Sequence, residues 1–304
     1  MTSTAHAAPL GYPAPSAIAE LLKPVTWFPP MWAFSCGVIA SGVPLAGHWG
    51  LVLVGVLLAG PMVCATSQAV NDWFDRHVDA INEPHRPIPS GRMPGRWGLY
   101  VAIVWTLLSL AVSFALGPWG FGAAVVGLML AWAYSAPPLR LKRNGWWGGA
   151  ACGLCYEGLA WVTGGVVMAG GQAPGAASLG LAALYSAGAL GIMTLNDFKA
   201  IEGDRQMGIG SLPVRLGVDG AARAACLIML LPQGVVVGLL LAWGAPVHAL
   251  AIVGLILAQA GMMKRFLQEP VRHALWYSGF GVPLFVSGMM ISAFALRGLS
   301  GALA

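Results

Sequence analysis

The segment NDWFDRHVD, residues 71–79, carries three carboxylates at a spacing that predicts how the chain is organised. On an α-helix, positions i, i+3 and i+7 share a face, so Asp72, Asp75 and Asp79 fall within an arc of about 60°, with Asn71 at its edge. Each close pair of these charges costs on the order of a few kcal/mol at an effective dielectric constant near 20. A divalent cation would relieve this repulsion, and oxygen ligands without His or Cys at matching spacing favour Mg²⁺ over Zn²⁺.

A second segment of similar form, NDFKAIEGD, occupies residues 196–204. It also opens on an Asn-Asp pair, with Asn196 in the place of Asn71. Asp197 and Asp204 are seven residues apart, so they share a helix face if one helix continues through both. We call residues 71–79 and 196–204 the first and second acidic segments, and we expect the rest of the chain to bring them together.

The composition is that of an integral membrane protein. Of the 304 residues, 58% are hydrophobic and only 9% are charged, whereas a soluble domain carries about 25% charged residues. The mean hydropathy is +0.74. The net charge of +5 does not indicate nucleic-acid binding, because the basic residues lie in short loops between apolar spans. The first twenty or so residues lack a basic region before an apolar core, so we expect no cleaved signal peptide.

Apolar spans of about 17 to 25 residues, the length that crosses a bilayer, predict an all-α membrane protein. We expect nine transmembrane helices in one domain, residues 25–304, which follows a cytoplasmic N-terminal segment, residues 1–24. The predicted spans are residues 25–44, 50–70, 98–117, 119–135, 146–168, 177–196, 221–243, 246–263 and 274–296.

The basic residues predict the orientation of these spans. Of the 16 Lys and Arg residues, all but Arg297 fall before span one or after an even-numbered span. The positive-inside rule makes that side cytoplasmic, with the N-terminus inside and the C-terminus outside. Both acidic segments lie on this side, at the ends of spans two and six, each before a loop with Pro, Gly, Ser and Arg. This pattern indicates a degenerate duplication whose halves place both acidic segments at one cavity mouth.

Cations accompany the carboxylates in these loops. Acidic clusters beside Arg and Lys suit a Mg²⁺-diphosphate, because the carboxylates hold the metal and the cations neutralise the remaining phosphate charge. For each single cation, membrane orientation explains its presence as well as phosphate contact does. The candidates for phosphate contact are Arg86, whose loop is stiffened by Pro87 and Pro89, and Lys142, Arg143, Lys199 and Arg205.

The segment YSAPPLRLK, residues 134–142, ends span four. Its two prolines stop the helix and favour an extended chain beyond it, which would put Arg140 and Lys142 on one side. Tyr134 could donate a hydrogen bond to a phosphate or anchor the helix at the membrane interface.

Span five holds Glu157, an acid placed within a span rather than at its end. An intramembrane carboxyl group is a candidate for substrate binding, although it could also be bonded within the bundle. Cys152 and Cys155 form a C-x-x-C pair in a Gly- and Ala-rich setting that favours packing over redox or metal chemistry. Glycines recur every four residues in this region, which indicates close helix packing or a flat wall for a planar ligand: Gly145, Gly149 and Gly153.

With these motifs in place, the chain resembles the UbiA superfamily of intramembrane prenyltransferases over nearly its whole length. The resemblance rests on NDxxDxxxD (71–79), HRPIPSGR (85–92), YSxPPLRLK (134–142) and EGDR (202–205) ahead of LPV (212–214). Within the superfamily, the forms NDFKxxEGDR and YSAPPLRLKxNGW are most similar to the chlorophyll and bacteriochlorophyll synthases. Many members carry an Asp where this chain has Ala200, so Asp197, one turn earlier, is the expected substitute.

The resemblance implies a nine-helix bundle around a central cavity, with Mg²⁺ bridging both acidic segments and an isoprenyl diphosphate as donor. It further implies transfer of a geranylgeranyl or phytyl group to the propionate carboxylate of a chlorophyllide or bacteriochlorophyllide, in the inner membrane of a bacterium. The implied catalytic and metal-binding residues are Asp72, Asp75, Asp79, Asp197 and Asp204. The implied substrate-binding residues are Asn71, Arg86, Tyr134, Arg140, Lys142, Glu157, Asn196, Lys199 and Arg205.

Two alternatives remain open on the sequence. The acceptor could be a quinone or haem precursor, although a propionate is already ionised at neutral pH and needs no general base, whereas an aromatic carbon must later lose a ring proton. The acidic segments could instead bind cations in a transporter, but transporter sites lie near the bilayer midplane and these lie at one face. The choice between the two chlorophyllides, and partnership with other pigment-synthesis or pigment-binding membrane proteins, are not decided by the sequence.

Overall fold

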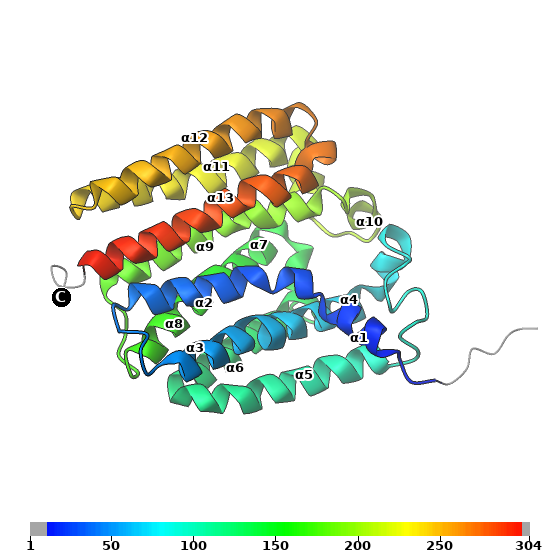
Figure 1. Ribbon diagram of the computed structural model, residues 1–304. Helices are drawn as coiled ribbons and strands as arrows, with labels where there is room; N and C mark the ends of the chain where they lie inside the picture. The colour runs from blue at the N-terminus through cyan, green and yellow to red at the C-terminus, as the bar shows by residue number, and fades with distance from the viewer. Residues whose placement is uncertain (1–10, 300–304) are drawn as a thin grey trace, which may run out of the picture.

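The computed structural model describes residues 11–299, and every regular element in that part of the chain is a helix (Figure 1). The first ten residues of the expected N-terminal segment, and residues 300–304 of the expected membrane domain, lie outside the described residues. The elements are α1 (Pro15–Leu22), η1 (Pro24–Thr26), α2 (Phe28–Ala40), α3 (Trp49–Leu57), η2 (Leu58–Cys64), α4 (Ala65–Asn82), α5 (Trp97–Ser113), η3 (Phe114–Leu116), α6 (Gly117–Ser135), η4 (Leu141–Arg143), α7 (Gly145–Gly153), η5 (Leu154–Leu159), α8 (Ala160–Met168), α9 (Ala176–Asp197), α10 (Ile201–Gln206), α11 (Leu212–Ala242), α12 (Pro246–Gln268) and α13 (Pro270–Leu299).

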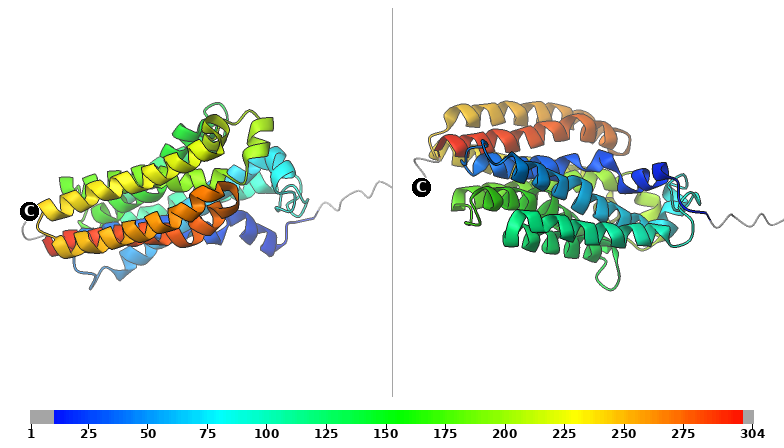
Figure 2. Two further views of the ribbon diagram at one scale, coloured as in Figure 1. Left: turned by 90° about the horizontal axis from the view of Figure 1, so that it is seen from above. Right: turned by 60° about the horizontal axis from the view of Figure 1, so that its bottom comes forward.

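The helices form an elongated bundle in which α11, α12 and α13 lie along one side and α3, α5 and α6 along the other (Figures 1 and 2). The short helices α1 and α10 and the loop between α4 and α5 gather at one end of the bundle. The chain leaves α13 at the opposite end. The two acidic segments therefore belong to the same end of the molecule.

Seven helical segments among residues 11–299 are long and apolar enough to cross a membrane, fewer than the nine spans predicted. One of the seven, Trp97–Ser135, contains both α5 and α6, which are separated near Gly117, a residue in the left-handed region with φ 72°. The first predicted span corresponds to α2, which has only 13 residues. The seven segments are Trp49–Asn82, Trp97–Ser135, Gly145–Met168, Ala176–Asp197, Leu212–Ala242, Pro246–Gln268 and Pro270–Leu299.

Two of these segments contain a π-helical stretch. In η2, Pro61 lies inside the helix and cannot donate a backbone N–H, which favours a local widening. The backbone carbonyl of Pro61 accepts a hydrogen bond from the indole N–H of Trp105 on α5, at 3.0 Å. The second π-helical stretch is η5, which carries Glu157.

Small residues let the central helices approach closely. A Cβ atom added at Gly37 of α2 would lie 1.8 Å from the carbonyl oxygen of Trp161 on α8, and one at Gly164 would lie 2.2 Å from that of Phe34. Such contacts between small residues are the main source of specific packing between membrane helices. The core beside this contact is aromatic, with Tyr185 stacked on Trp161 and bonded through its hydroxyl to Ser292 at 2.8 Å.

Candidate active site

The first acidic segment lies on a helix, as the sequence predicted. Residues 71–79 fall inside α4, which continues to Asn82. Asp72 is only 1% exposed and Asp79 only 7% exposed. Asn71 donates a hydrogen bond to Asp75 at 2.9 Å, one helical turn away. Buried carboxylates require partners, because an unpaired charge away from water is costly.

The second acidic segment does not form one continuous helix. Helix α9 ends at Asp197, three residues form a turn, and α10 begins at Ile201. Asp197 and Asp204 therefore do not share the face of a single helix, although both line the same cavity. Asp197 is bonded to the backbone of Leu212. Burial has the largest effect on the Asp204 carboxyl and raises its pKa above the usual range, although the nearby Ser211 acts in the opposite direction.

The two acidic segments line one small cavity of about 170 Å³. An ion pair links the second segment to the end of α4, since Lys199 Nζ lies 3.0 Å from Glu83 Oε1. Gly203 permits the close approach, because a Cβ there would lie 2.2 Å from the amide of Asn82. The site residues around this cavity are Asn71, Asp75, Asp79, Arg86, Tyr134, Lys142, Asp197, Lys199 and Asp204.

Arg86 joins the carboxylates of the first acidic segment. Its Nη1 lies 2.9 Å from both oxygens of Asp79 and 3.3 Å from Asp72 Oδ1, while its Nε lies 2.9 Å from Glu83 Oε2. Burial alone would lower the pKa of the guanidinium, but these acids raise it above its usual value. Burial would likewise raise the pKa of Glu83, but hydrogen bonds and charges from Lys199 and Arg86 hold it below its usual value. Glu83 and Arg86 are therefore both held in their charged forms.

Arg140 and Lys142 both reach Asp75, but not from an extended chain. Helix α6 ends at Ser135, as the prolines predicted. The chain then turns back, with the N–H of Arg140 bonded to the carbonyl of Ala136 at 2.9 Å. Arg140 adopts φ 38°, in the left-handed region, and Lys142 lies in the 3-10 turn η4. The Lys142 ammonium pairs with Asp75 Oδ2, and Arg140 Nη2 lies 3.3 Å from Asp75 Oδ1. Burial, the largest influence on Lys142, lowers its pKa.

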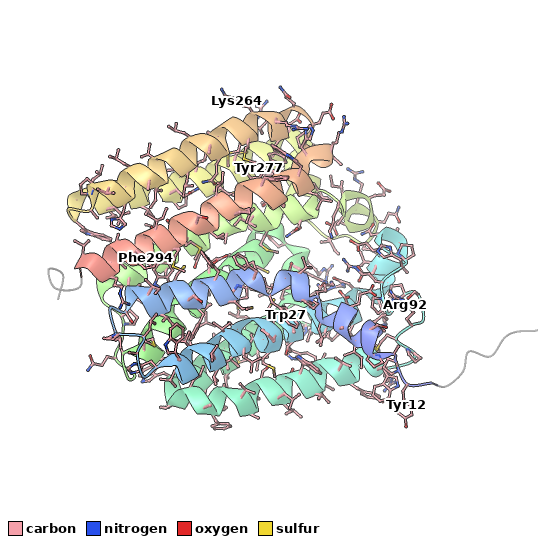
Figure 3. The ribbon with its side chains drawn as sticks, viewed as in Figure 1. Tyr12, Trp27, Arg92, Lys264, Tyr277 and Phe294 are labelled. Carbon is pink, nitrogen blue, oxygen red and sulfur yellow. The ribbon has the colours of Figure 1, made fainter. Side chains whose placement is uncertain are left out.

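Lys23 is a site residue that sequence reasoning missed. Its ammonium lies 2.5 Å from Asp72 Oδ1, the shortest ion pair of this carboxylate. Lys23 itself adopts φ 47° between α1 and η1. Helix α1 is fastened to the loop after α4 by Arg92, which binds both oxygens of Glu20 at 2.6 and 2.8 Å; Figure 3 labels Arg92 at this end of the molecule. The position of Lys23 ahead of an apolar span indicated only membrane orientation.

A larger cavity of about 750 Å³ adjoins the small one, because both are lined by Asn71, Glu83, Arg86, Tyr134 and Lys199. Charged and amide side chains occupy its mouth, and the surface along its length is mostly apolar. Its other predicted site residues are Asp72, Glu157 and Asn196.

Glu157 lies in η5 and is 3% exposed. Its Oε2 atom has no hydrogen-bond partner among the described residues, so the structure does not bond both carboxyl oxygens within the bundle. Cys152 and Cys155 line the same cavity as free thiols. The glycines near them pack closely against other parts of the protein. An added Cβ would meet Leu212 at Gly145, Leu190 at Gly149 and Ser186 at Gly153.

Two of the implied substrate-binding residues, Arg140 and Arg205, line neither cavity, but Arg140 pairs with Asp75, whereas Arg205 does not reach the acidic cluster. The Arg205 side chain is 64% exposed and lies 3.6 Å from Glu202 on the outer face of α10. Asp204 and Arg205 are neighbours on α10 but point in different directions. Asp204 lies on the buried face of the helix, and Arg205 lies on its exposed face. A direct phosphate contact by Arg205 stays a prediction from the motif.

The carboxylates suit a hard divalent cation by their chemistry. All the donors are oxygen atoms, which Mg²⁺ prefers, and Asp72 Oδ2 is buried without a hydrogen-bond partner in the described chain. Among residues 11–299 no three acidic, His or Cys side chains are already gathered to hold a metal. The three Asp residues of α4 are instead paired with Lys23, Arg86, Arg140 and Lys142.

Comparison with known proteins agrees with the motifs. Residues 26–295 match the UbiA prenyltransferase family. The chain is 56% identical over 291 residues to the bacteriochlorophyll synthase 33 kDa chain of Cereibacter sphaeroides, covering 96% of each chain. It is 39% identical over 291 residues to the chloroplastic chlorophyll synthase of Oryza sativa subsp. japonica, covering 91% of this chain and 75% of that one.

Solved structures share the fold. A UbiA homolog from Archaeoglobus fulgidus, bound to GPP and Mg²⁺, superposes with a TM-score of 0.61 at 18% identity, covering 94% of this chain and 99% of that one. The family match favours prenyl transfer over the cation transporter considered above. It also confirms the resemblance inferred from the motifs: this multi-pass membrane protein belongs to the UbiA prenyltransferase family.

Proposed function

We propose that this prenyltransferase moves a geranylgeranyl or phytyl group from its diphosphate to the propionate carboxylate of a bacteriochlorophyllide or chlorophyllide. The observation that carries the proposal is the meeting of both acidic segments at one small polar cavity, beside a larger and mostly apolar one. The relatives named bacteriochlorophyll and chlorophyll synthase support the acceptor. A bacteriochlorophyllide is favoured by the higher identity to the first of these.

The polar cavity is suited to a diphosphate held through Mg²⁺. Asp72, Asp75, Asp79, Asp197 and Asp204 are the residues that would hold the metal, and the binding of GPP and Mg²⁺ by a protein of the same fold supports this assignment. When bound, Mg²⁺ withdraws charge from the diphosphate oxygens and stabilises the leaving group.

The cations of the site complete the neutralisation of the diphosphate. Arg86, Lys142 and Lys199 line the small cavity, and Lys23 and Arg140 lie beside its carboxylates. Because these groups are already gathered at the site, they need only turn from carboxylate to phosphate oxygens on binding, and little reorganisation remains when charge develops on the leaving oxygen. As the bond between the allylic carbon and the diphosphate oxygen breaks, positive charge grows on the prenyl carbon. An ionised propionate attacks that carbon directly, without a general base.

The apolar cavity explains why the reaction takes place in a membrane protein. A prenyl tail gains about 0.8 kcal/mol for each CH₂ kept in an apolar phase, while its diphosphate requires polar partners. A cavity that is apolar along its length and charged at its mouth meets both needs. We further propose nine crossings, counting α2 once and α5 and α6 separately, in a bacterial inner membrane with the N-terminus and the site on the cytoplasmic side.

Esterification by the purified protein tests this function. The protein in detergent is supplied with Mg²⁺, geranylgeranyl or phytyl diphosphate, and either chlorophyllide or bacteriochlorophyllide, and the esterified pigment is separated by chromatography. Removal of the metal with a chelator abolishes the product, and added Mg²⁺ restores it. A wild-type protein that esterifies neither pigment contradicts the proposal.

Substitution of Asp75 tests the site. We expect Asp75→Asn to lower the esterification rate by about 10²–10³-fold, the cost of losing one preorganised electrostatic group. Asp219→Asn is the matched control, because Asp219 is exposed on α11 and lines neither cavity. Equal rates in the two variants, at equal membrane insertion, would remove Asp75 from the mechanism.

A further inference from the structure

A cluster of neutral polar groups lies inside the larger cavity and is not explained by the metal and diphosphate site. The hydroxyl of Tyr156, on η5, lies 3.0 Å from Gln68 Nε2, 3.1 Å from Ser67 Oγ and 3.4 Å from Cys64 Sγ. These three partners come from the end of η2 and the start of α4. All four side chains line the cavity of about 750 Å³.

The hydrogen bonds of this cluster have a definite direction. The Ser67 hydroxyl donates to the carbonyl of Cys64 at 2.7 Å, so its oxygen accepts the proton of the Tyr156 hydroxyl. The Tyr156 oxygen in turn accepts a hydrogen bond from Gln68. The single S–H of Cys64 lies within reach of both this oxygen and the carbonyl of Thr26, at 3.4 and 3.3 Å. The side-chain amide of Gln68 is thereby held with its nitrogen toward Tyr156. One N–H of that nitrogen is used. The second makes no hydrogen bond by distance and angle among the described residues, although the Cys64 thiol lies near the amide.

The second N–H of Gln68 is well placed for a ligand in the cavity. Gln68 is only partly buried and lines the cavity. It precedes Asp72 by one helical turn, so the two side chains lie on the same face of α4. The charged residues Lys23, Asp72 and Arg86 occupy the mouth, and Gln68 is the next polar side chain along that face. Under the proposed function, a group bound to Gln68 would lie one helical turn from Asp72 and so next to the diphosphate of the donor.

We propose that Gln68, oriented by Tyr156, donates its free N–H to one carboxylate oxygen of the acceptor and so positions the other oxygen for attack. This inference rests on the proposed function and assigns a positioning residue to it. A carboxylate that enters a mostly apolar cavity must find hydrogen-bond donors. A neutral amide supplies one without the full ion pair that would make the oxygen a weaker nucleophile.

The step balances without a further reactant. The free carboxylate oxygen forms a bond to the allylic carbon, and the bond from that carbon to the diphosphate oxygen breaks with its electron pair going to diphosphate. No proton is transferred, and Gln68 and Tyr156 keep their protons throughout. The ester product has lost the charge that strengthened the bond to Gln68, which favours its release.

Binding of an acceptor with and without the carboxylate charge tests the inference. Chlorophyllide and its propionate methyl ester are titrated into the detergent-solubilised protein, and the quenching of pigment fluorescence gives the Kd of each. We expect the wild-type protein to bind the free acid about tenfold more tightly than the methyl ester. Gln68→Met, which keeps the shape and removes the amide, should bind the two equally well. Tyr156→Phe, which frees the amide to rotate, should reduce the preference in the same direction.

Thr163→Val serves as the matched control. Thr163 also lines the cavity, but its hydroxyl is bonded to the carbonyl of Leu159 in its own helix at 2.6 Å. This variant should keep the wild-type preference for the free acid. In steady-state rates, Gln68→Met should raise the KM of the acceptor and leave the KM of the prenyl diphosphate within twofold.

The inference and the proposed function fail differently. A Gln68→Met protein that keeps the wild-type preference, or whose main change is a higher KM for the diphosphate, overturns the role of Gln68. The esterification assay on the wild-type protein is unaffected by either result. Absence of ester product from the wild-type protein overturns the proposed function itself.

Discussion

The carboxylates of α4 obtain their cationic partners from outside their own helix. Lys23 precedes η1, Arg86 lies in the loop after α4, and Lys142 follows α6. The acids could be predicted because their spacing is a property of one helix. The pairing of Lys23 with Asp72 could not, because it depends on the left-handed backbone at Lys23 and on how α1 packs. The contact between Gln68 and Tyr156 could not be predicted either, because both residues are uncharged and neither belongs to one of the motifs.

Replacement of Lys23 should weaken donor binding. We expect Lys23→Met to raise the KM of the prenyl diphosphate about tenfold, because a charge-assisted hydrogen bond contributes roughly 1.5–3 kcal/mol. The KM of the pigment acceptor should change less than twofold. Initial rates with each substrate varied in turn measure both values. Lys264→Met, on an exposed position of α12, controls for the loss of one positive charge, and equal effects of the two variants would contradict the prediction.

Helices were predicted well where hydrophobic spans set their length, and less well where packing interrupts them. The turn between α9 and α10 divides the second acidic segment at Phe198. Phe198 is 2% exposed and packs edge-to-face against Phe266, with ring centroids 5.6 Å apart. Burial of this ring is a tertiary effect that local helix propensity does not contain. The sequence therefore located both acids of this segment but not the break between them.

The crossing of α2 and α8 should depend on the absence of a side chain at Gly37. We expect Gly37→Ala to reduce the yield of folded protein sharply, because its methyl group would lie 1.8 Å from a backbone oxygen of α8. Overpacking of this kind typically costs about 1–3 kcal/mol or more. The melting temperature and the size-exclusion profile in detergent measure the effect.

Gly254→Ala is the control for this prediction. Gly254 lies on α12, and no atom is found within 4 Å of an added Cβ there. Its melting temperature should match that of the wild-type protein. If Gly37→Ala melts at the same temperature as Gly254→Ala, the tight crossing does not exist.

The molecule as a whole is polarised along its length. Both acidic segments and α1 lie at one end, and the turn between α5 and α6 belongs to the far end of those helices (Figure 1). The distribution of Lys and Arg predicted this arrangement, because every one of them except Arg297 falls before span one or after an even-numbered span. The number of crossings was harder to obtain, since it depends on whether a short helix such as α2 spans the bilayer.

Labelling of single cysteines should resolve the crossings. In a background with the five native cysteines replaced by alanine, Trp119→Cys places a thiol at a 62% exposed position in the α5–α6 turn. A membrane-impermeant maleimide should label it on intact cells. His85→Cys, in the loop after α4, should react only after the membrane is permeabilised. Labelling of both positions on intact cells would contradict nine crossings with the N-terminus inside.

The ion pairs around Asp72, Asp75 and Asp79 have a consequence for how a charged substrate enters and leaves. Each cation that faces a carboxylate can turn to a phosphate oxygen at the moment the carboxylate accepts a metal ion. Under the proposed function, binding would be an exchange of partners, in which each cation would keep a negative neighbour and each acid a positive one. When the diphosphate left, the original ion pairs would reform, so the resting enzyme would not present a bare acidic pocket at the membrane surface.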